Sequence, residues 1–367
     1  MAIRGNLFSN IVATEYFSTV GPRLVMQISR IGPFALEEPL DETVHSNVLR
    51  GVHVERRLNV AVKLLPRSLL TRAMGNGTFL EDVKKLQNLD HPAIVRLLGG
   101  AVEHGQPYLA MELVEGESLR AHLDRRGRLP WEAAVEMADT ICSALEQAHG
   151  QAIVHQRLTP RRVMLPQKGG VKLIGFDCAW ADRDEVMGLH SPMEVANYLA
   201  PEQFRGKPSA LLPASDMFSL GVILFELLTG ELPWPADSPT HLIQARRASP
   251  APRVSSRVLD CPVWLDLLIS GLLVVRRSER FATALETHRA LVDTQRKVAG
   301  GMGAAQQAWS GQRGTLTIDP ERKEVHRLRR QQLQDQQRKS PTGGAFYDRV
   351  WFLTLCLIAL AGAGIWA

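Results

Sequence analysis

The chain has 367 residues, of which 45% are hydrophobic and 22% are charged, so it buries ample apolar surface for one large or two small domains. Its formal net charge of +5 permits an anionic partner without requiring one, and a solvated surface with some excess Lys and Arg is the simpler interpretation. The four cysteines are scattered without a C-x-x-C pair, which argues against a disulfide framework and a zinc site and favours a reducing compartment.

Strands are predicted for much of the first third of the chain. Residues 1–30 show no interpretable pattern, and we treat them as an N-terminal extension without an assigned role. Residues 31–50 suggest short strands around a polar turn, and the alternating, β-branched run 58–65 predicts another strand. Apolar residues at helical spacing, including Leu80, predict an amphipathic helix over 79–89, and residues 108–114 are again typical of a strand.

Helical patterns dominate the next part of the chain. Residues 131–149 have helical periodicity, and residues 217–228 predict a strongly apolar helix that Gly230 is expected to cap. Residues 264–275 and 282–292 predict further helices. Strands followed by helices indicate an α+β protein with a small sheet lobe and a larger helical lobe.

The C-terminal part differs in composition from the rest. Residues 295–349 are rich in Gln, Gly and Arg, and we expect a polar juxtamembrane linker there. Residues 350–367 carry no charge and would form a helix ~27 Å long, close to the ~30 Å hydrocarbon core of a bilayer. We expect a single transmembrane helix here, with a buried core helix as the alternative. The basic residues of 327–349 would then keep the large N-terminal part in the cytoplasm.

Seven short motifs occur in a fixed order along residues 31–294. They are VAVK at 60–63, DHPAIV at 90–95, MELV at 111–114, IVHQRLTP at 153–160, APE at 200–202, SDMFSLG at 215–221 and Arg280. In this order and spacing they resemble the motifs of Ser/Thr protein kinases. The resemblance implies a bilobal protein-kinase-like fold, with a small antiparallel β-sheet N-lobe that carries helix αC and a larger α-helical C-lobe.

The resemblance also implies a nucleotide site between the lobes. Lys63 matches the lysine that contacts the nucleotide phosphates, and Asp82 matches the acidic residue of helix αC that pairs with that lysine. Met111 matches the gatekeeper before the hinge. The other positions at which the resemblance implies nucleotide contact are Val48, Ala61, Glu112, Val114, Met164 and Arg162.

The positions that carry out phosphoryl transfer in the family are altered here. Arg157 stands where the family has its catalytic Asp, and a guanidinium cannot accept a proton. Arg162 and Gly175 stand at the two Mg²⁺ ligand positions, and neither side chain offers the hard oxygen that Mg²⁺ prefers. The three phosphate-loop glycines are replaced by Asp41, Thr43 and Ser46. We therefore expect no catalytic residue and no metal ligand, although Asp177 is an alternative carboxylate close to the metal position.

The scaffold positions of the family are kept. By resemblance, His155, Phe176 and Leu86 belong to the regulatory spine, and Asp216 anchors the helix that follows the activation segment. Glu202 and Arg280 match a buried ion pair that fixes the end of that segment.

A kept scaffold with altered chemistry predicts a membrane-anchored pseudokinase that acts as a signalling scaffold or a nucleotide-binding module. We expect protein partners at the kinase-like domain, the membrane at the C-terminal helix, and no nucleic acid. ATP is the implied cofactor, bound without Mg²⁺, and Arg157 and Arg162 either bind its phosphates directly or form a plain basic surface. The alternative is an active, atypical Ser/Thr kinase that uses Asp177 or another carboxylate to transfer the γ-phosphate to protein hydroxyls.

Overall fold

The computed structural model describes residues 11–16, 23–40, 47–67, 78–176, 192–205 and 212–299. The chain divides into two compact units, Met1–Gly303 and Ala304–Ala367, and the second unit lies outside the described residues. The predicted transmembrane helix 350–367 and the predicted linker beyond residue 299 therefore lie outside them too. None of the helices that the structure describes combines the length and hydropathy needed to cross a bilayer.

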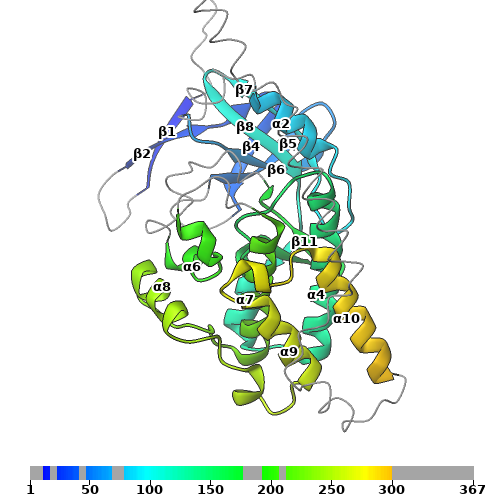
Figure 1. Ribbon diagram of the computed structural model, residues 1–367. Helices are drawn as coiled ribbons and strands as arrows, with labels where there is room; N and C mark the ends of the chain where they lie inside the picture. Colours follow the sequence, from blue (N-terminus) through cyan, green and yellow to red (C-terminus); the bar gives the residue numbers. More distant parts are fainter. Residues whose placement is uncertain are drawn as a thin grey trace, which may run out of the picture. The chain divides into compact units, whose positions relative to one another are not determined.

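A six-stranded antiparallel sheet forms the first lobe, in the order β3-β4-β5-β6-β8-β7 (Figure 1). Successive side chains in β6 alternate between the two faces of this sheet. Val60 and Val62 are fully buried in the core on one face, so Ala61 and Lys63 share the opposite face. The strands are β3 (Arg30–Ile31), β4 (Phe34–Pro39), β5 (Val48–His53), β6 (Leu58–Leu64), β7 (Leu97–Glu103) and β8 (Gln106–Glu112).

Helix α2 (Thr78–Gln87) packs against β7 and corresponds to the predicted amphipathic helix. Phe79 and Val83 are buried beside Leu109 of β8, and Leu86 packs against the same cluster. The prediction that Leu80 belongs to the apolar stripe is wrong, because its side chain is 56% exposed. The buried stripe follows positions 79, 83 and 86, and Leu80 lies beside that stripe on the solvent face.

The second lobe is helical and is organised around α7 (Pro213–Thr229), which is buried from Ala214 to Leu228. Helix α7 packs against α4, α9 and α10, and it ends at Gly230, whose φ of 75° gives the left-handed cap that the sequence predicts. The other helices are α3 (Leu119–Arg126), α4 (Trp131–Gly150), α6 (Met193–Ala196), α8 (Pro239–Ala248), α9 (Val263–Leu272) and α10 (Ala284–Ala299).

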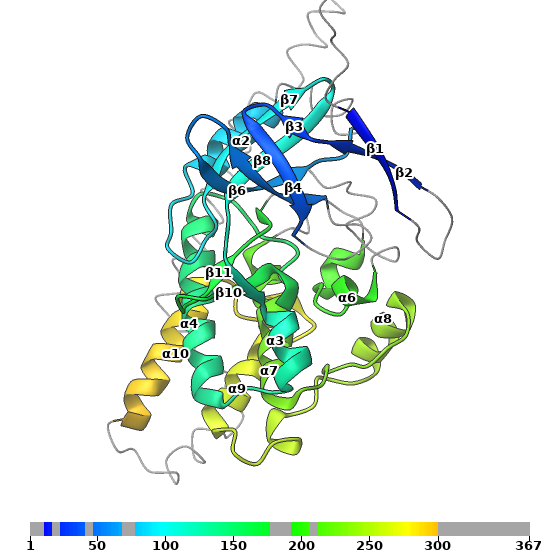
Figure 2. The same cartoon turned by 180° about the vertical axis from the view of Figure 1, so that it is seen from behind.

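A small three-stranded sheet packs against α3, and its strands β10 and β11 are labelled in Figure 2. It consists of β9 (Gly116–Ser118), β10 (Val163–Pro166) and β11 (Lys172–Leu173), in the order β11-β10-β9. Leu173 exchanges main-chain hydrogen bonds with the loop before β7: its N–H donates to Ala93 at 2.8 Å, and its carbonyl accepts from Val95 at 2.9 Å. These bonds hold β11, which ends two residues before Gly175, against the loop that precedes β7.

Two segments differ from the sequence-based expectations. Residues 1–30, to which no structure was assigned, contain β1 (Ile11–Tyr16) and β2 (Arg23–Ile28), which pair with each other as a separate antiparallel sheet. Helix α10 runs to Ala299 instead of ending near residue 292, so it includes the first residues of the predicted linker.

Candidate functional site

Strands β5 and β6 carry the first-lobe residues to which the resemblance assigns nucleotide contact, and the face of the sheet on which they lie is named the cleft face. Val48 is the cross-strand partner of Lys63, so the two side chains lie on one face of the sheet together with Ala61. Met164 comes from the other lobe, in β10, where it pairs with Ser118 and Lys172. The residues that the resemblance assigns to adenine contact thus come from both lobes.

The segment after β8 corresponds to the hinge between the lobes. Among the described residues, the main-chain N–H of Val114 donates no hydrogen bond, which leaves it suited to a ring acceptor of a nucleotide. The Glu112 side chain is engaged within the protein: its carboxylate accepts a hydrogen bond from Lys172 at 2.7 Å, which joins the hinge to β11. The residues of the cleft face and the hinge fit a nucleotide base, with Glu112 in a structural role.

An ion-paired arginine, which the sequence analysis did not identify, lies next to these residues. Arg50, two residues after Val48 on β5, is 2.9 Å from Glu38 of β4. Its Nη1 and Nη2 donate to the two carboxylate oxygens of Glu115 at 2.9 and 3.3 Å. The hydrogen bond from Arg50 holds the pKa of Glu115 below its usual value. Arg50 therefore links the sheet to the chain just after the hinge, in the bidentate geometry that suits a guanidinium.

Asp82 lies on α2, as the resemblance requires, and its carboxylate is 3.2 Å from Lys85 of the same helix. Lys63 lies on the cleft face of β6 and is half-buried. Both residues thus occupy the elements that the family uses for its lysine–acid pair.

The residues at the family's two Mg²⁺ ligand positions, Arg162 and Gly175, are in contact. Arg162 ends the 3₁₀ helix Pro160–Arg162, and its Nη1 donates a hydrogen bond to the carbonyl of Gly175 at 3.1 Å. Gly175 has a φ of 91°, in the left-handed region that favours glycine. A Cβ atom at this position would lie 2.0 Å from Nη1 and 3.0 Å from Cζ of Arg162. The guanidinium therefore fills the space that a carboxylate side chain at position 175 would need.

These residues do not fit Mg²⁺. Neither Arg162 nor Gly175 supplies a side-chain oxygen, and Mg²⁺ requires an octahedron of oxygen ligands. A guanidinium about 4 Å from a divalent ion would cost roughly 8 kcal/mol at an effective dielectric constant near 20, before ionic screening. Within the described residues, no cluster of three or more His, Cys, Asp or Glu side chains could hold a metal ion. Asp177, the alternative carboxylate, lies outside the described residues, as do Asp41, Thr43 and Ser46.

The loop that carries Arg157 keeps an ordered backbone. Arg157 N–H donates to the His155 carbonyl at 2.9 Å, and the intervening Gln156 has a φ of 69°. The Gln203 side chain donates to the Gln156 carbonyl at 2.7 Å, which joins this loop to the segment after the APE motif. The backbone of this loop is therefore fixed, with Arg157 at the sequence position of the family's catalytic base, and a guanidinium cannot accept a proton.

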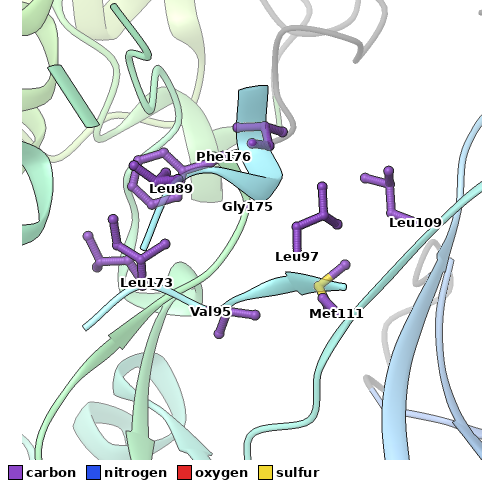
Figure 3. Close-up of a pocket in the computed structure, with 10 residues that line it drawn as sticks. Leu89, Val95, Leu97, Leu109, Met111, Leu173, Gly175 and Phe176 are labelled. Atoms are coloured by element: carbon purple, nitrogen blue, oxygen red, sulfur yellow. The ribbon is translucent and has the colours of Figure 1, made fainter. Parts of the chain in front are cut away.

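Two of the three spine residues, Leu86 and Phe176, line a small cavity, and the third, His155, packs against Phe176. The rings of His155 and Phe176 meet edge to face, with centroids 4.7 Å apart. Phe176 and Leu86 line a cavity of about 40 Å³, with Phe176 on one side and Met111 and Leu109 on the other (Figure 3). A cavity of this size has room for a water molecule or two. The interior behind the gatekeeper is thus nearly filled by side chains.

Asp216 of α7 anchors the loop that carries Arg157. Its fully buried carboxylate accepts hydrogen bonds from the main-chain N–H groups of His155 and Gln156, each at 2.8 Å. The ring Nε2 of His149 lies 2.8 Å from the same carboxylate. Asp216 therefore holds the loop through its backbone, independently of the side chain at position 157.

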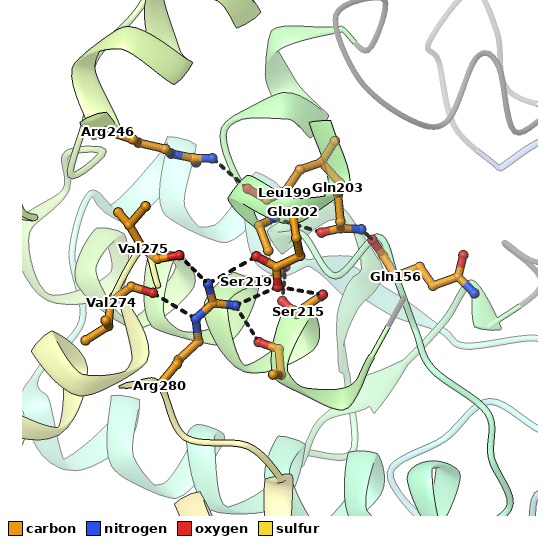
Figure 4. A network of polar contacts seen from close by, with 12 residues as sticks. Gln156, Leu199, Glu202, Gln203, Ser215, Ser219, Arg246, Val274, Val275 and Arg280 are labelled. Carbon is orange, nitrogen blue, oxygen red and sulfur yellow. Dashed lines mark hydrogen bonds and ion pairs between the residues drawn. The ribbon is translucent and has the colours of Figure 1, made fainter. Parts of the chain in front are cut away.

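Glu202 and Arg280 form the ion pair that the resemblance implies (Figure 4). The Arg280 Nη1 and Nη2 atoms donate to the two oxygens of Glu202 at 2.9 and 3.2 Å. Arg280 also donates to the carbonyls of Ala214, Val274 and Val275. Burial by itself raises the pKa of Glu202, but the hydrogen bonds and charge of Arg280 outweigh it and hold that pKa below its usual value.

A second buried arginine holds the same segment. Arg246 of α8 donates to the carbonyls of Leu199 and Asn197, each at 2.6 Å (Figure 4). Its guanidinium lies over the rings of Phe218 and Trp234 at 4.9 and 5.3 Å. Burial, and then the charge of Arg280, lower the pKa of Arg246 to about 9, which still leaves it protonated at neutral pH. Arg246 belongs to no short motif. It lies four residues after Leu242, on the same face of α8, and this spacing is the sequence signal that could have indicated its burial.

Comparison with known proteins identifies the family. The protein kinase domain model matches residues 35–290, most of the chain, so the chain belongs to the protein kinase family. The serine/threonine-protein kinase PknB of Mycobacterium leprae (strain TN) is 32% identical over 253 residues, which cover 67% of this chain and 40% of that protein. The serine/threonine-protein kinase PknL of Mycobacterium tuberculosis (strain H37Rv) is 30% identical over 245 residues, 65% of this chain and 60% of that protein.

A solved structure shares the fold. The crystal structure of Rad53 residues 1–466 in complex with AMP-PNP has a TM-score of 0.58 and 23% sequence identity, and the match covers 70% of this chain and 64% of that chain. The chain therefore has the bilobal kinase fold that the motifs predict. It spans less than two thirds of the curated relatives' length, so their activities do not carry over to it directly.

Proposed function

We propose that this chain is a membrane-anchored protein of the kinase fold that does not transfer phosphate, and that it acts as a signalling scaffold or nucleotide-binding module. The observation that carries this proposal is the contact between Arg162 and Gly175, in which a guanidinium fills the space that the family's metal-binding carboxylate side chain would need. Phosphoryl transfer depends on positioning and on neutralisation of charge around the γ-phosphate, and the family uses Mg²⁺ for the second task. Arg157, in place of the base, supports the same conclusion.

The scaffold half of the proposal is supported by the intact polar network. Asp216, Glu202 and Arg280 hold the loop and the end of the activation segment in place although the chemistry is altered. A protein partner that recognises the kinase-like surface would need this kept shape and no turnover. Nucleic acid is not part of the proposal.

The second candidate is an active, atypical Ser/Thr kinase. The curated relatives are named serine/threonine-protein kinases, and Lys63 is kept on the cleft face of β6. Such an enzyme would need a carboxylate from elsewhere, for which Asp177 is the candidate. It would also need Arg162 to leave the position it has over Gly175.

A phosphotransfer assay separates the two candidates. The purified full chain, incubated with radiolabelled ATP, Mg²⁺ or Mn²⁺ and a generic protein substrate, is expected to transfer no label above background. The Lys63→Met variant serves as the control for a contaminating kinase, since it removes the phosphate-contacting lysine without touching the two arginines. Incorporation by the parent that Lys63→Met abolishes would overturn the proposal and favour the active enzyme.

Membrane anchoring rests on residues 350–367, which are uncharged and preceded by a basic segment. We expect the full chain expressed in cells to remain in the membrane pellet after carbonate extraction, and a variant that lacks 350–367 to appear in the supernatant. A protease added from outside should leave the kinase-like domain intact until the membrane is dissolved. Release of the full chain by carbonate would exclude the anchor.

A further inference from the structure

The guanidinium of Arg162 occupies the space in which a side chain at position 175, one of the family's two Mg²⁺ ligand positions, would begin. We propose that the cleft binds a nucleoside triphosphate in its metal-free form, with Arg162 in place of Mg²⁺, and that added Mg²⁺ weakens this binding. The inference rests on the proposed nucleotide-binding role and specifies its ligand and its regulation.

Arg162 is held in position before any ligand arrives. It ends a 3₁₀ helix that begins with Pro160, and its main-chain carbonyl accepts from the N–H of Ile174 at 3.0 Å. Its Nη1 donates to the Gly175 carbonyl at 3.1 Å, and the absence of a side chain on Gly175 gives the guanidinium its space. A planar, permanently charged guanidinium binds phosphate oxygens well, and fixing it in advance lowers the entropy lost on binding.

The cleft has a second cation and a wall for the base. Lys63 shares the cleft face of β6 with Ala61, and its cross-strand partner Leu109 lines the same cavity as Gly175. The lysine strand and the Arg162–Gly175 contact therefore border one region between the lobes. Val48 and Ala61 provide apolar surface for a base, and the Val114 N–H provides a donor.

The charge of the nucleotide determines which of its two forms, free or bound to Mg²⁺, the cleft binds more tightly. Free ATP carries about four negative charges near neutral pH, and its Mg²⁺ complex about two, so the cations of the cleft attract the free form more strongly. The Mg²⁺ complex would also bring a divalent cation toward Arg162, and neither Arg162 nor Gly175 offers a side-chain oxygen to hold that ion. We expect a difference of roughly tenfold in Kd between the two forms.

The test is a calorimetric titration of the full chain with ATP, first in EDTA and then in excess Mg²⁺ at matched ionic strength. The expected result is a Kd about tenfold lower in EDTA, with AMP binding more weakly than ATP in either buffer. Arg162→Ala should remove the preference for metal-free ATP, and Arg162→Lys should keep part of it. Arg161→Ala is the matched control: it removes an identical charge one residue away, from a 43% exposed side chain that pairs with Glu194 at 3.2 Å.

The outcomes discriminate between this inference and the proposed function. Tighter binding with Mg²⁺, or equal effects of Arg162→Ala and Arg161→Ala, would overturn the inference and leave the absence of phosphotransfer standing. No binding in either buffer would overturn it as well and leave a scaffold without a nucleotide. Circular dichroism and the Tm without ligand are measured for each variant, and Arg162→Gln replaces Arg162→Ala if the latter does not fold.

Discussion

Replacing Arg280 by methionine is expected to lower the free energy of unfolding by about 3–5 kcal/mol, as measured by urea denaturation. The Arg280 side chain is fully buried, and it donates to both oxygens of Glu202 and to the carbonyls of Ala214 and Val274. The substitution leaves the Glu202 carboxylate without its positive partner in a largely buried place, and it removes donors from buried carbonyls. Methionine keeps most of the apolar contact, so the loss reports mainly on the polar network.

The control for this prediction is Arg276→Met, a few residues earlier in the chain. Arg276 is 80% exposed and pairs with Glu279 at 3.1 Å within one turn. Exposed pairs of this kind contribute little, so we expect a change within about 0.5 kcal/mol. Similar losses for the two variants would show that the buried network does not contribute as its geometry implies.

A second readout of the same pair is its dependence on pH. Because Arg280 holds the pKa of Glu202 below the ordinary value of 4.5, the ionised pair stabilises the folded chain above that pH. This stabilisation is lost as the pH falls through the lowered pKa of the folded state. The difference in stability between the parent and Arg280→Met should therefore be largest near neutral pH and shrink in acid, and a difference independent of pH would contradict the assignment.

The elements with long periodic patterns are those that the sequence predicts well. The long apolar run before Gly230 predicts a helix over 217–228, and the structure has it as α7, which ends at that glycine. The strands β9, β10 and β11 have only two to four residues each, and such short segments carry no period to detect. Leu80 shows a further limit, because helical spacing alone does not fix which edge of an apolar stripe meets the core.

The candidate site was predictable in its positions and not in its contacts. The order of the motifs identified Arg157, Arg162 and Gly175 as altered, since a motif match is a local property of the sequence. That the Arg162 guanidinium lies over Gly175 depends on how β10 and β11 are held together, which spacing does not specify. The Arg50–Glu115 and Arg246–Leu199 contacts were missed for the same reason: each joins segments far apart in the chain, and neither lies in a motif that signals the pairing.

Replacing Asp216 by alanine is the second substitution with a large expected effect, a loss of about 3–5 kcal/mol in the free energy of unfolding. The fully buried carboxylate accepts from the N–H groups of His155 and Gln156, and His149 donates its ring N–H to it. Without Asp216 these donors are left unsatisfied in the interior, each at a cost of about 1–3 kcal/mol. Asp216→Asn should lose less stability, because its remaining side-chain oxygen can still accept hydrogen bonds. It should still lose some, because its amide group would face one of the main-chain N–H donors.

The location of the effect distinguishes an anchor from a general core residue. Asp124→Ala is the control, since it removes an exposed carboxylate that pairs with Arg120 on the surface of α3. Amide hydrogen exchange should become faster at His155, Gln156 and Arg157 in Asp216→Asn, while α7 itself stays protected, because the lost bonds hold the loop to the helix and not the helix to its core. Uniform loss of protection across α7 would show that Asp216 stabilises the helix itself. Other contacts would then have to hold the loop that carries Arg157 and Arg162 in place.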